Sequence, residues 1–567
     1  MNGTNPDETV ESVCPCCSVG CRVRYSDRRD GAVGCDGAPV NEEGRLCRNG
    51  INAFDGLNAA DRLTDPLIRE EGNLVSVTWE KAFDRIEAEF ETVLDDRGPD
   101  ALAFFGAPRC TNEENYLLQK LARVLGTNNV DNRARICHGS VVAAMVERLG
   151  SPGMTNTLSD LTEADLFLVL GANPAAQQPI AFNSYLRPAI NDGAMLIHVE
   201  PDANETTRLA DAHVAPTPGT DALFVNAVTA ELLDRELQDE AFIAERTTNF
   251  ESFAESLASL TLAECAERTG VDAERIRHIA ERFGRADRAA VIVGTGAEED
   301  DHEGTATADA LIDLLLVTGN IGRRGTGMNL LRGLTNEQGA NDVGCRPSTL
   351  PGFRPVADAD ARSAVAEEWG AAPPSRPGRS ELDAVRAFGD AIRGAYVVGE
   401  NPAVSKRGTQ SVARSLESLD FLLVQEAFPT ETVEHADVVL PASLWAEKGG
   451  TVTNLDRQVQ RMRPMTPPPD GVRRDLDILL EIGRRLTDAR FEYDDREEVF
   501  DELTRVNPLY AGMSYDGIGH GSQRWPLPDD AEEGTEILHE ERFRTGERRT
   551  AFVPVEDVPT RVSAHHD

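Results

Sequence analysis

Short apolar runs alternate with longer stretches of helical periodicity beyond about residue 60. The runs are bounded by glycine or polar residues, and they are too short for buried helices. The clearest of them are residues 101–105, 166–170, 195–199, 290–293, 396–398 and 421–424. Continuous apolar strands separated by helices predict parallel sheets that are covered on both faces.

Helical periodicity is clearest over residues 113–125, where Leu117, Leu118, Leu121 and Leu125 share one face, and over residues 306–317. Residues 371–378 and 464–471 are rich in proline or glycine and are predicted to be loops. The alternation of the two patterns predicts an α/β fold with doubly wound parallel sheets.

One short motif occurs twice, each time directly after an apolar strand. Gly171-Ala-Asn173-Pro174 follows the strand 166–170, and Gly399-Glu400-Asn401-Pro402 follows the strand 396–398. Ligands of open α/β sheets bind beyond the carboxyl ends of the strands, where glycine lets backbone N–H groups approach a phosphate. The repeat therefore predicts two nucleotide-like ligands, with two ordinary strand-to-helix turns as an equal alternative. The sequence has no Gly-x-Gly-x-x-Gly motif between a strand and a helix and no Walker A motif, which disfavours direct binding of NAD or ATP.

The charge composition narrows the range of partners. The chain has 97 acidic and 57 basic residues and a net charge of −40. Its only lysines are Lys81, Lys120, Lys406 and Lys448. A surface this negative repels nucleic acid and anionic lipid. The scarcity of lysine favours a halophile-like protein over an ordinary acidic one. The sequence has no apolar run long enough to span a membrane and no secretory signal, so we expect a cytoplasmic protein.

Six of the ten cysteines fall within residues 14–47. In a reducing compartment such a group indicates a metal site rather than disulfides. Cys14, Cys17, Cys21 and Cys47 combine tight early spacing with a distant fourth thiol, a pattern that suits a four-iron cubane. Structural zinc is the alternative, although zinc sites favour paired knuckles and the second pair is absent here. Cys16 and Cys35 are expected to be free thiols turned away from the cluster.

Several segments resemble one enzyme superfamily. Cys14-Pro-Cys-Cys17-x3-Cys21 with Arg45-Leu-Cys47 resembles the amino-terminal domain of the molybdopterin oxidoreductases, and Arg135-Ile-Cys137-His138-Gly-Ser resembles the formate dehydrogenase signature within it. Further similar segments occur in the family order. They are residues 218–221, 331–344, 425–441, 445–457 and 525–541. The resemblance covers almost the whole chain.

The resemblance implies a molybdenum or tungsten centre held by two molybdopterin guanine dinucleotides, one [4Fe-4S] cluster, and reversible oxidation of formate to carbon dioxide. It implies that Cys137 ligates the metal, that His138 accepts or relays a proton and that Arg332 binds formate through its planar fork. The residues that it implies for cofactor binding are Gly171, Asn173, Pro174, Glu200, Gly219, Thr220, Asp221, Gly294, Gly296, Gly333, Gln338, Gly399, Glu400, Asn401 and Gln425. Electrons would leave through the cluster to an acceptor protein or subunit, ferredoxin or NAD-linked.

The resemblance also implies how the domains divide the chain. We expect an iron–sulfur domain from residues 1–63 with about 447–475 and 498–567. One pterin-dinucleotide domain would comprise 64–137, 336–446 and 476–497, and a second would comprise 138–335. The carboxyl-terminal barrel domain of the family is not evident, so the expectation is that a separate chain supplies it or that this copy is incomplete.

Two positions depart from the family pattern. Asn49 stands where a lysine is common, and Glu200-Pro-Asp202 replaces an acidic-Pro-Arg sequence. Two other functions remain alternatives. An assimilatory nitrate reductase typically has methionine after the metal cysteine, so His138 speaks against it. A non-catalytic electron-transfer relative loses the metal cysteine, which Cys137 retains.

Overall fold

The computed structural model describes residues 10–26, 31–298, 301–406 and 409–555. The chain divides into two compact units. Unit 1 comprises residues 1–136, 334–454 and 458–534, and unit 2 comprises residues 137–333, 455–457 and 535–567. The chain of unit 1 is thus interrupted by most of unit 2.

Unit 1 is built on a seven-stranded sheet with the order β5-β4-β18-β17-β16-β6-β7. Its strands are β4 (Leu67–Glu70), β5 (Asn73–Ser76), β6 (Leu102–Gly106), β7 (Val130–Asn132), β16 (Gly394–Val398), β17 (Phe421–Glu426) and β18 (Val438–Pro441). The five strands from β18 to β7 are parallel, and β4 and β5 form an antiparallel edge. The predicted parallel sheet is confirmed.

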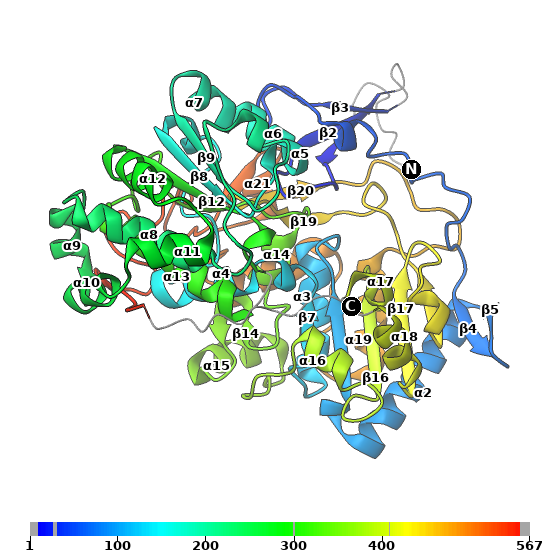
Figure 1. Cartoon of the computed structure of the whole chain (residues 1–567). Coiled ribbons are helices and arrows are strands. Elements are labelled where there is room, and N and C mark those ends of the chain that lie inside the picture. Colours follow the sequence, from blue (N-terminus) through cyan, green and yellow to red (C-terminus); the bar gives the residue numbers. More distant parts are fainter. Residues whose placement is uncertain (1–9, 27–30, 299–300, 407–408, 556–567) are drawn as a thin grey trace. The chain divides into compact units, whose positions relative to one another are not determined.

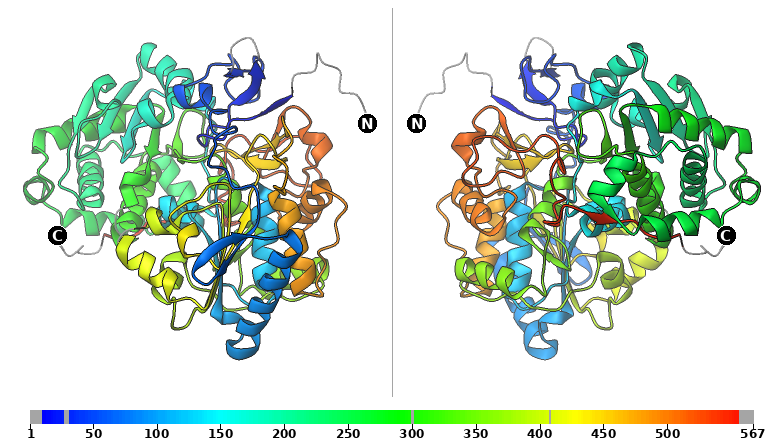
Figure 2. Two further views of the ribbon diagram at one scale, coloured as in Figure 1. Left: turned by 90° about the vertical axis from the view of Figure 1, so that its right-hand side faces the viewer. Right: turned by 90° about the vertical axis from the view of Figure 1, so that its left-hand side faces the viewer.

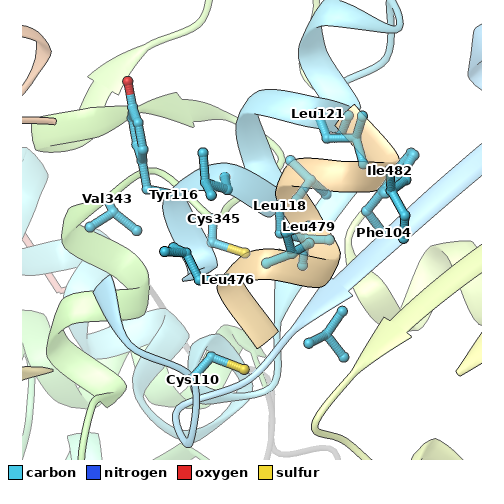
Figure 3. Close-up of a cluster of buried hydrophobic side chains, with 14 of the residues drawn as sticks. Phe104, Cys110, Tyr116, Leu118, Leu121, Val343, Cys345, Leu476, Leu479 and Ile482 are labelled. Atoms are coloured by element: carbon cyan, nitrogen blue, oxygen red, sulfur yellow. The ribbon is translucent and has the colours of Figure 1, made fainter. Parts of the chain in front are cut away.

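Helices cover both faces of this sheet (Figures 1 and 2). One face packs against α2 (Trp79–Arg97), α3 (Asn112–Val124) and α19 (Asp475–Leu486), and the other against α16 (Glu381–Arg386) and α18 (Thr409–Glu417). Alternate residues of each strand point to opposite faces. Phe104 of β6 therefore packs with Leu121 and Ile482 (Figure 3), whereas the neighbouring Phe105 belongs to the core beneath α16 and α18.

Two small antiparallel sheets complete unit 1. One contains β1 (Glu11–Val13), β2 (Arg22–Ser26) and β3 (Gly31–Gly34), and the other contains β19 (Gly450–Thr453), β20 (Gln458–Met462) and β21 (Ser522–Arg524). They join the amino-terminal segment to residues 450–524 through Arg22, whose guanidinium bonds to Gln460 at 3.1 Å and to the carbonyl of Gly521 at 2.6 Å. The helices α1 (Arg48–Ile51), α14 (Glu337–Asp342) and α20 (Arg496–Val506) also belong to this unit.

Unit 2 has a five-stranded, wholly parallel sheet with the order β10-β9-β8-β12-β13. Its strands are β8 (Leu166–Leu170), β9 (Met195–Val199), β10 (Ala212–Val214), β12 (Ala289–Val293) and β13 (Gly327–Leu330). Helix α8 (Asp221–Asp234) packs against α12 (Ala273–Arg285) and α13 (Asp301–Val317). All six strands and both helices expected from the hydrophobic pattern are present, with small shifts of their ends.

The segment from residue 535 onward differs from expectation, because it groups with unit 2 and not with the cysteine-rich region. Strand β22 (Thr550–Ala551) pairs with β11 (Thr247–Thr248). The buried guanidinium of Arg246 donates to the carbonyls of His539 and Glu540, each at 2.8 Å. Phe552 stacks on Phe253 with ring centroids 4.8 Å apart. These contacts involve tertiary partners about 300 residues away, which the sequence pattern could not indicate.

Candidate cofactor sites

The first site in unit 1 is the group of cysteines near the amino terminus. Cys14 follows β1, and its backbone N–H donates to the carbonyl of Cys21 at 2.8 Å, closing a turn that contains Cys17. Cys47 caps α1, where its sulfur accepts the N–H of Gly50 at 3.4 Å. A Cβ atom on Gly50 would lie 3.7 Å from the sulfur of Cys14. Cys14 and Cys47 therefore lie on either side of Gly50.

The thiols of this group act on one another. Burial raises the pKa of Cys17 to about 12, and the nearby Cys47 and Cys16 raise it as well. Burial also raises the pKa of Cys21, with contributions from Cys17 and Cys47. Metal ligation requires thiolates. The protein alone therefore disfavours the charged form that a cationic cluster would stabilise.

Cys16 does not follow the expectation that it turns away. Its thiol and that of Cys14 are hydrogen-bonded, which lowers the pKa of Cys16 to about 7, with a further contribution from Arg109. The sequence placed Cys16 outside the ligand spacing, but a residue next to two ligands in a tight turn remains close to them. Cys35 is different, since burial and the neighbouring Glu11 raise its pKa and none of the four cysteines contributes.

A crevice of about 390 Å³ is the second feature of unit 1. It opens where β6, β16, β17 and β18 end, and its lining includes Gly399, Glu400 and Asn401 of the second repeated motif. It extends to Pro15 in the cysteine turn. The switch point of a doubly wound sheet is where such a ligand crevice is expected. We call it the unit 1 crevice.

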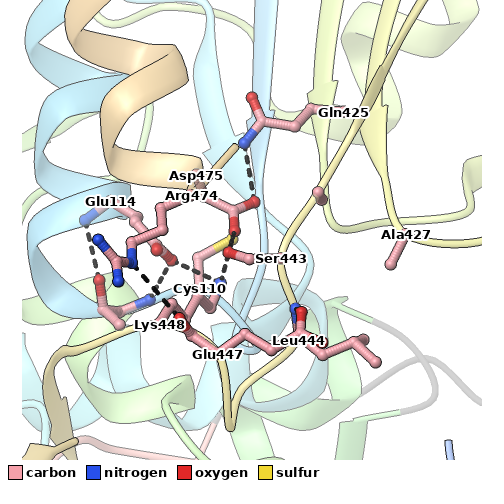
Figure 4. A network of polar contacts seen from close by, with 12 residues as sticks. Cys110, Glu114, Gln425, Ala427, Ser443, Leu444, Glu447, Lys448, Arg474 and Asp475 are labelled. Atoms are coloured by element: carbon pink, nitrogen blue, oxygen red, sulfur yellow. Dashed lines mark hydrogen bonds and ion pairs between the residues drawn. The ribbon is translucent and has the colours of Figure 1, made fainter. Parts of the chain in front are cut away.

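Gln425, which the resemblance placed at this cofactor site, does not line the crevice. Its amide donates to Asp475 at 2.8 Å (Figure 4). Its carbonyl oxygen accepts the hydroxyl of Tyr396. Gln338 is likewise buried, in α14, where its amide donates to Asp342 at 2.7 Å. Both side chains hold the fold of unit 1 together.

Charged residues at the base of the crevice were missed by the sequence reading. Lys448 is buried and donates to Glu114 at 2.8 Å, and it lies 3.3 Å from Asp475 (Figure 4). Burial raises the pKa of Glu114 to about 7, although Lys448 opposes the rise. Burial raises the pKa of Glu426 similarly, to about 7. Two signals were available in the sequence, since lysine is scarce and Lys448 lies in the family-like segment 445–457. The structure adds that three of the four lysines are buried.

Both repeated motifs make the same internal contacts. The side-chain oxygen of Asn173 accepts the N–H and hydroxyl of Thr206 at 3.3 and 2.9 Å, and that of Asn401 accepts those of Thr432 at 3.1 and 2.7 Å. The amide groups donate to Glu205 at 2.8 Å and to Glu431 at 2.6 Å. The asparagine side chains therefore stabilise the strand-to-helix turn. A ligand would be contacted by the glycines and the backbone groups of the motif.

The corresponding strand ends of unit 2 are closely packed around Gly171. Gly171 has φ = +59°, and a Cβ on Gly294 would lie 2.3 Å from its carbonyl oxygen. Gly296 is hydrogen-bonded to the same carbonyl at 2.9 Å. Pro174 begins the short helix α5 (Pro174–Gln177). The motif's glycines thus allow two chain segments to approach closely.

Four other predicted residues of unit 2, Glu200, Gly219, Thr220 and Asp221, lie beyond the ends of β9 and β10. The carbonyl of Glu200 accepts a hydrogen bond from His213 at 2.8 Å. Gly219 has φ = +80° and precedes Thr220, which caps α8 immediately before Asp221. The loop thus places an acidic residue at the first turn of a helix.

The candidate catalytic residues belong to unit 2. Helix α4 (Ala134–Leu149) is broken at His138, whose φ and ψ are −145° and 34°. His138 is buried, and burial together with the charge of Arg332 lowers its pKa to about 3. Arg332 lies two residues after the end of β13, and its guanidinium donates to the carbonyl of Pro152 at 3.1 Å. Cys137 is half-buried beside His138. Two residues almost 200 positions apart are thus brought together.

Backbone contacts hold this pair in place. The amide of Gln178 donates to the carbonyl of Arg332 at 3.1 Å. Gly333 follows at the boundary of the unit. Neither ring nitrogen of His138 makes a well-aligned hydrogen bond to the described protein atoms, although the Val293 carbonyl is near enough to oppose the fall in pKa. A buried imidazole without a well-aligned partner calls for an explanation, and a bound ligand would supply one.

Comparison with known proteins decides the family. The molybdopterin oxidoreductase model matches residues 62–485, which is most of the chain. The chain belongs to the molybdopterin oxidoreductase family. Within the family it is 37% identical over 552 residues to the F420-dependent formate dehydrogenase subunit alpha of Methanocaldococcus jannaschii, covering 96% of this chain and 80% of that protein. It is 35% identical to formate dehydrogenase H of Escherichia coli, with 94% and 76% covered.

A solved structure of the same fold is the acetylene hydratase of Pelobacter acetylenicus. It superposes with a TM-score of 0.76 at 18% identity, over 96% of this chain and 77% of that one. At this identity the likeness concerns the fold alone. It confirms that this molybdopterin oxidoreductase has the α/β architecture expected from its sequence.

The residues present fit the cofactors of such an enzyme. Among the described residues, no three His, Cys, Asp or Glu side chains gather closely enough to hold a single metal ion. A four-iron cluster is larger than one ion, and it takes four thiolate ligands, which Cys14, Cys17, Cys21 and Cys47 could supply from one region of unit 1. The unit 1 crevice and the glycine turns of unit 2 suit the phosphates of a dinucleotide. Within the described residues no helix is long and apolar enough to cross a membrane.

Proposed function

We propose that this oxidoreductase is a formate dehydrogenase. The observation that supports the proposal best is the pairing of buried His138 with Arg332, next to Cys137, in a chain whose similar proteins include formate dehydrogenases. These groups are reactive or polar, and core packing alone does not explain their convergence. His138 also distinguishes the chain from a nitrate reductase, as the family pattern implies.

Each residue has a chemical role in the oxidation, which converts formate to carbon dioxide, one proton and two electrons. The guanidinium of Arg332 binds both formate oxygens, because its planar fork matches a carboxylate. With Nη2 held by the carbonyl of Pro152, the fork has a fixed orientation. His138 is neutral in this setting, because burial and Arg332 lower its pKa, so its lone pair can accept a hydrogen bond from the substrate or a proton carrier.

A molybdenum or tungsten centre with two pterin guanine dinucleotides would supply the two-electron acceptor when bound. Cys137 would be its thiolate ligand. The glycine turns around Gly171 and Gly399 would approach the dinucleotides, and Asp221 would lie at a guanine. Cys14, Cys17, Cys21 and Cys47 would hold one [4Fe-4S] cluster, from which electrons pass to an acceptor protein in the cytoplasm.

Formate-dependent reduction of a dye tests the proposal. Cys137→Ala should abolish the activity while the iron–sulfur absorbance remains, and Cys265→Ala, which removes another buried thiol of unit 2, should leave the activity intact. Arg332→Lys should raise KM for formate, because a point charge replaces a fork. Arg323→Lys, at an exposed position nearby in the sequence, is its control.

Two results would contradict the assignment. Formate oxidation at the wild-type rate in Cys137→Ala would exclude Cys137 as the ligand. The second result would be protein purified in high salt that contains molybdenum or tungsten and oxidises a reduced dye with nitrate, but never reduces a dye with formate. That result would exclude formate as the substrate.

A further inference from the structure

Arg109 connects the unit 1 crevice to the cysteine turn. It follows β6 by three residues, is exposed and lines the crevice. Its Nη1 donates a hydrogen bond to the carbonyl of Pro15 at 3.1 Å. Pro15 also lines the crevice, and it lies between Cys14 and Cys16 in the turn. One side chain therefore contacts the cysteine turn and faces the space in which the repeated motif would hold a ligand.

Arg109 has no carboxylate partner among the described residues. The other cation of the crevice lining, Lys448, is held between Glu114 and Asp475. The remaining charged lining consists of carboxyl groups, of which Glu400 and Glu426 belong to the strand ends. An anionic ligand in this crevice would thus find its available positive charge at Arg109.

We propose that Arg109 is a positioning and tuning residue that binds an anionic oxygen of the cofactor in the unit 1 crevice and raises the reduction potential of the cluster on the cysteine turn. The inference rests on the proposed function. A guanidinium has five N–H donors in a plane, so one bond to Pro15 leaves the others for the ligand. A positive charge near a cluster favours its reduced form, which carries one more negative charge.

The test compares three variants of the holoenzyme. Arg109→Gln removes the charge, Arg109→Lys keeps it but loses the fork, and Arg24→Gln removes an exposed arginine on β2 that does not line the crevice. Each protein is titrated with redox mediators while the reduced cluster is followed by electron paramagnetic resonance. Iron, molybdenum and tungsten contents are measured in the same samples.

We expect Arg109→Gln to lower the equilibrium constant for one-electron reduction of the cluster by about tenfold. This corresponds to a fall of about 59 mV in its reduction potential. Arg109→Lys should keep the wild-type potential but retain less molybdenum or tungsten, since a point charge replaces a planar fork. Arg24→Gln should leave both quantities unchanged.

Three outcomes would overturn the inference. One is an unchanged potential in Arg109→Gln at full iron content, and another is an equal shift in Arg24→Gln, which would indicate general surface charge. If Arg109→Gln loses its iron, the test relies on Arg109→Lys instead. A shifted cluster potential together with full molybdenum or tungsten content in Arg109→Lys is the third outcome, because it contradicts both the charge role and the cofactor-binding role. Wild-type enzyme without a cluster signal would instead refute the proposed function itself.

Discussion

The parallel sheets of the two units share one plan and differ in what surrounds it. Strands β10, β9, β8, β12 and β13 of unit 2 correspond in order to β18, β17, β16, β6 and β7 of unit 1. The Asn173 and Asn401 contacts repeat, and so do the bonds from Leu196 to Asp211 and from Leu422 to Asp437, both at 2.8 Å. The shared arrangement of the strand ends is therefore supported by the same few side chain-to-backbone hydrogen bonds in both units.

The residues around the strand ends differ between the two units. Unit 1 has an open crevice over a buried network of Lys448 and carboxylates, whereas unit 2 has glycines in close contact and a buried imidazole beside an arginine. The same turn chemistry thus supports two sites with different charge. The following substitutions test which features belong to the shared plan.

The largest effect should come from Lys448→Met. Removing the ammonium leaves Glu114 and Asp475 buried without their cation, so we expect the free energy of unfolding to fall by about 3–5 kcal/mol. Urea unfolding measures the change. The control Lys81→Met removes an exposed ion pair with Glu70 and should cost about 0–1 kcal/mol. Equal effects of the two variants would mean that the buried network contributes nothing specific.

Glycine substitutions at the strand ends should destabilise unit 2 more than unit 1. Gly294→Ala places a Cβ 2.3 Å from the carbonyl oxygen of Gly171, so the backbone must shift at a cost of about 2–3 kcal/mol. At Gly399 the nearest atom would be the sulfur of Cys110 at 3.4 Å, and the strain comes from φ = +65°, at about 1–2 kcal/mol. Thermal unfolding should rank Gly294→Ala below Gly399→Ala. The reverse order would show that unit 2 is packed less tightly than its geometry indicates.

Asparagine substitutions test the shared plan directly. Asn173→Ala and Asn401→Ala each remove the acceptor of a threonine N–H and hydroxyl, and we expect similar losses of about 1–2 kcal/mol. Limited proteolysis of each unit can report the local loss. A large effect at only one of the two positions would indicate that the two motifs share a sequence but do not contribute equally to stability.

The smallest effect concerns pH. The folded pKa of Glu426 is raised from 4.5 to about 7 by burial and by Asp475, while Lys448 and the N–H groups of Ala427 and Phe428 oppose the rise. The folded protein therefore binds more protons than the unfolded chain between about pH 4.5 and 7, and this contribution to stability is lost as pH rises through that window.

Glu426→Gln should flatten this dependence. Urea midpoints measured at intervals from pH 5 to 8 should fall less steeply in the variant than in the wild type. Asp313 of unit 2, whose pKa is also raised to about 7 by burial, remains in both proteins, so a residual slope is expected. An unchanged slope in Glu426→Gln would show that Glu426 is ionised throughout the range.

Much of the fold could be predicted from the sequence because its signals are local. Apolar runs such as residues 166–170 and 421–424 became buried parallel strands, and the helical periodicity of residues 113–125 became α3. The candidate catalytic pair was found through motifs, since Cys137-His138 and Arg332 each have a characteristic sequence context. The similar proteins confirm the family that those motifs indicated.

Other features of the site depend on contacts that no local pattern specifies. The sequence by itself determined the strands, the glycine turns and the types of reactive residue, because these follow from periodicity and from backbone conformation. Only the tertiary structure decided that Gln425 is internal, that Cys16 stays beside Cys14, that Lys448 is held between carboxylates and that Arg109 contacts the cysteine turn. The pKa of His138 likewise depends on burial and on an arginine almost 200 residues away, and electrostatic interactions depend on distance in space rather than on separation along the chain.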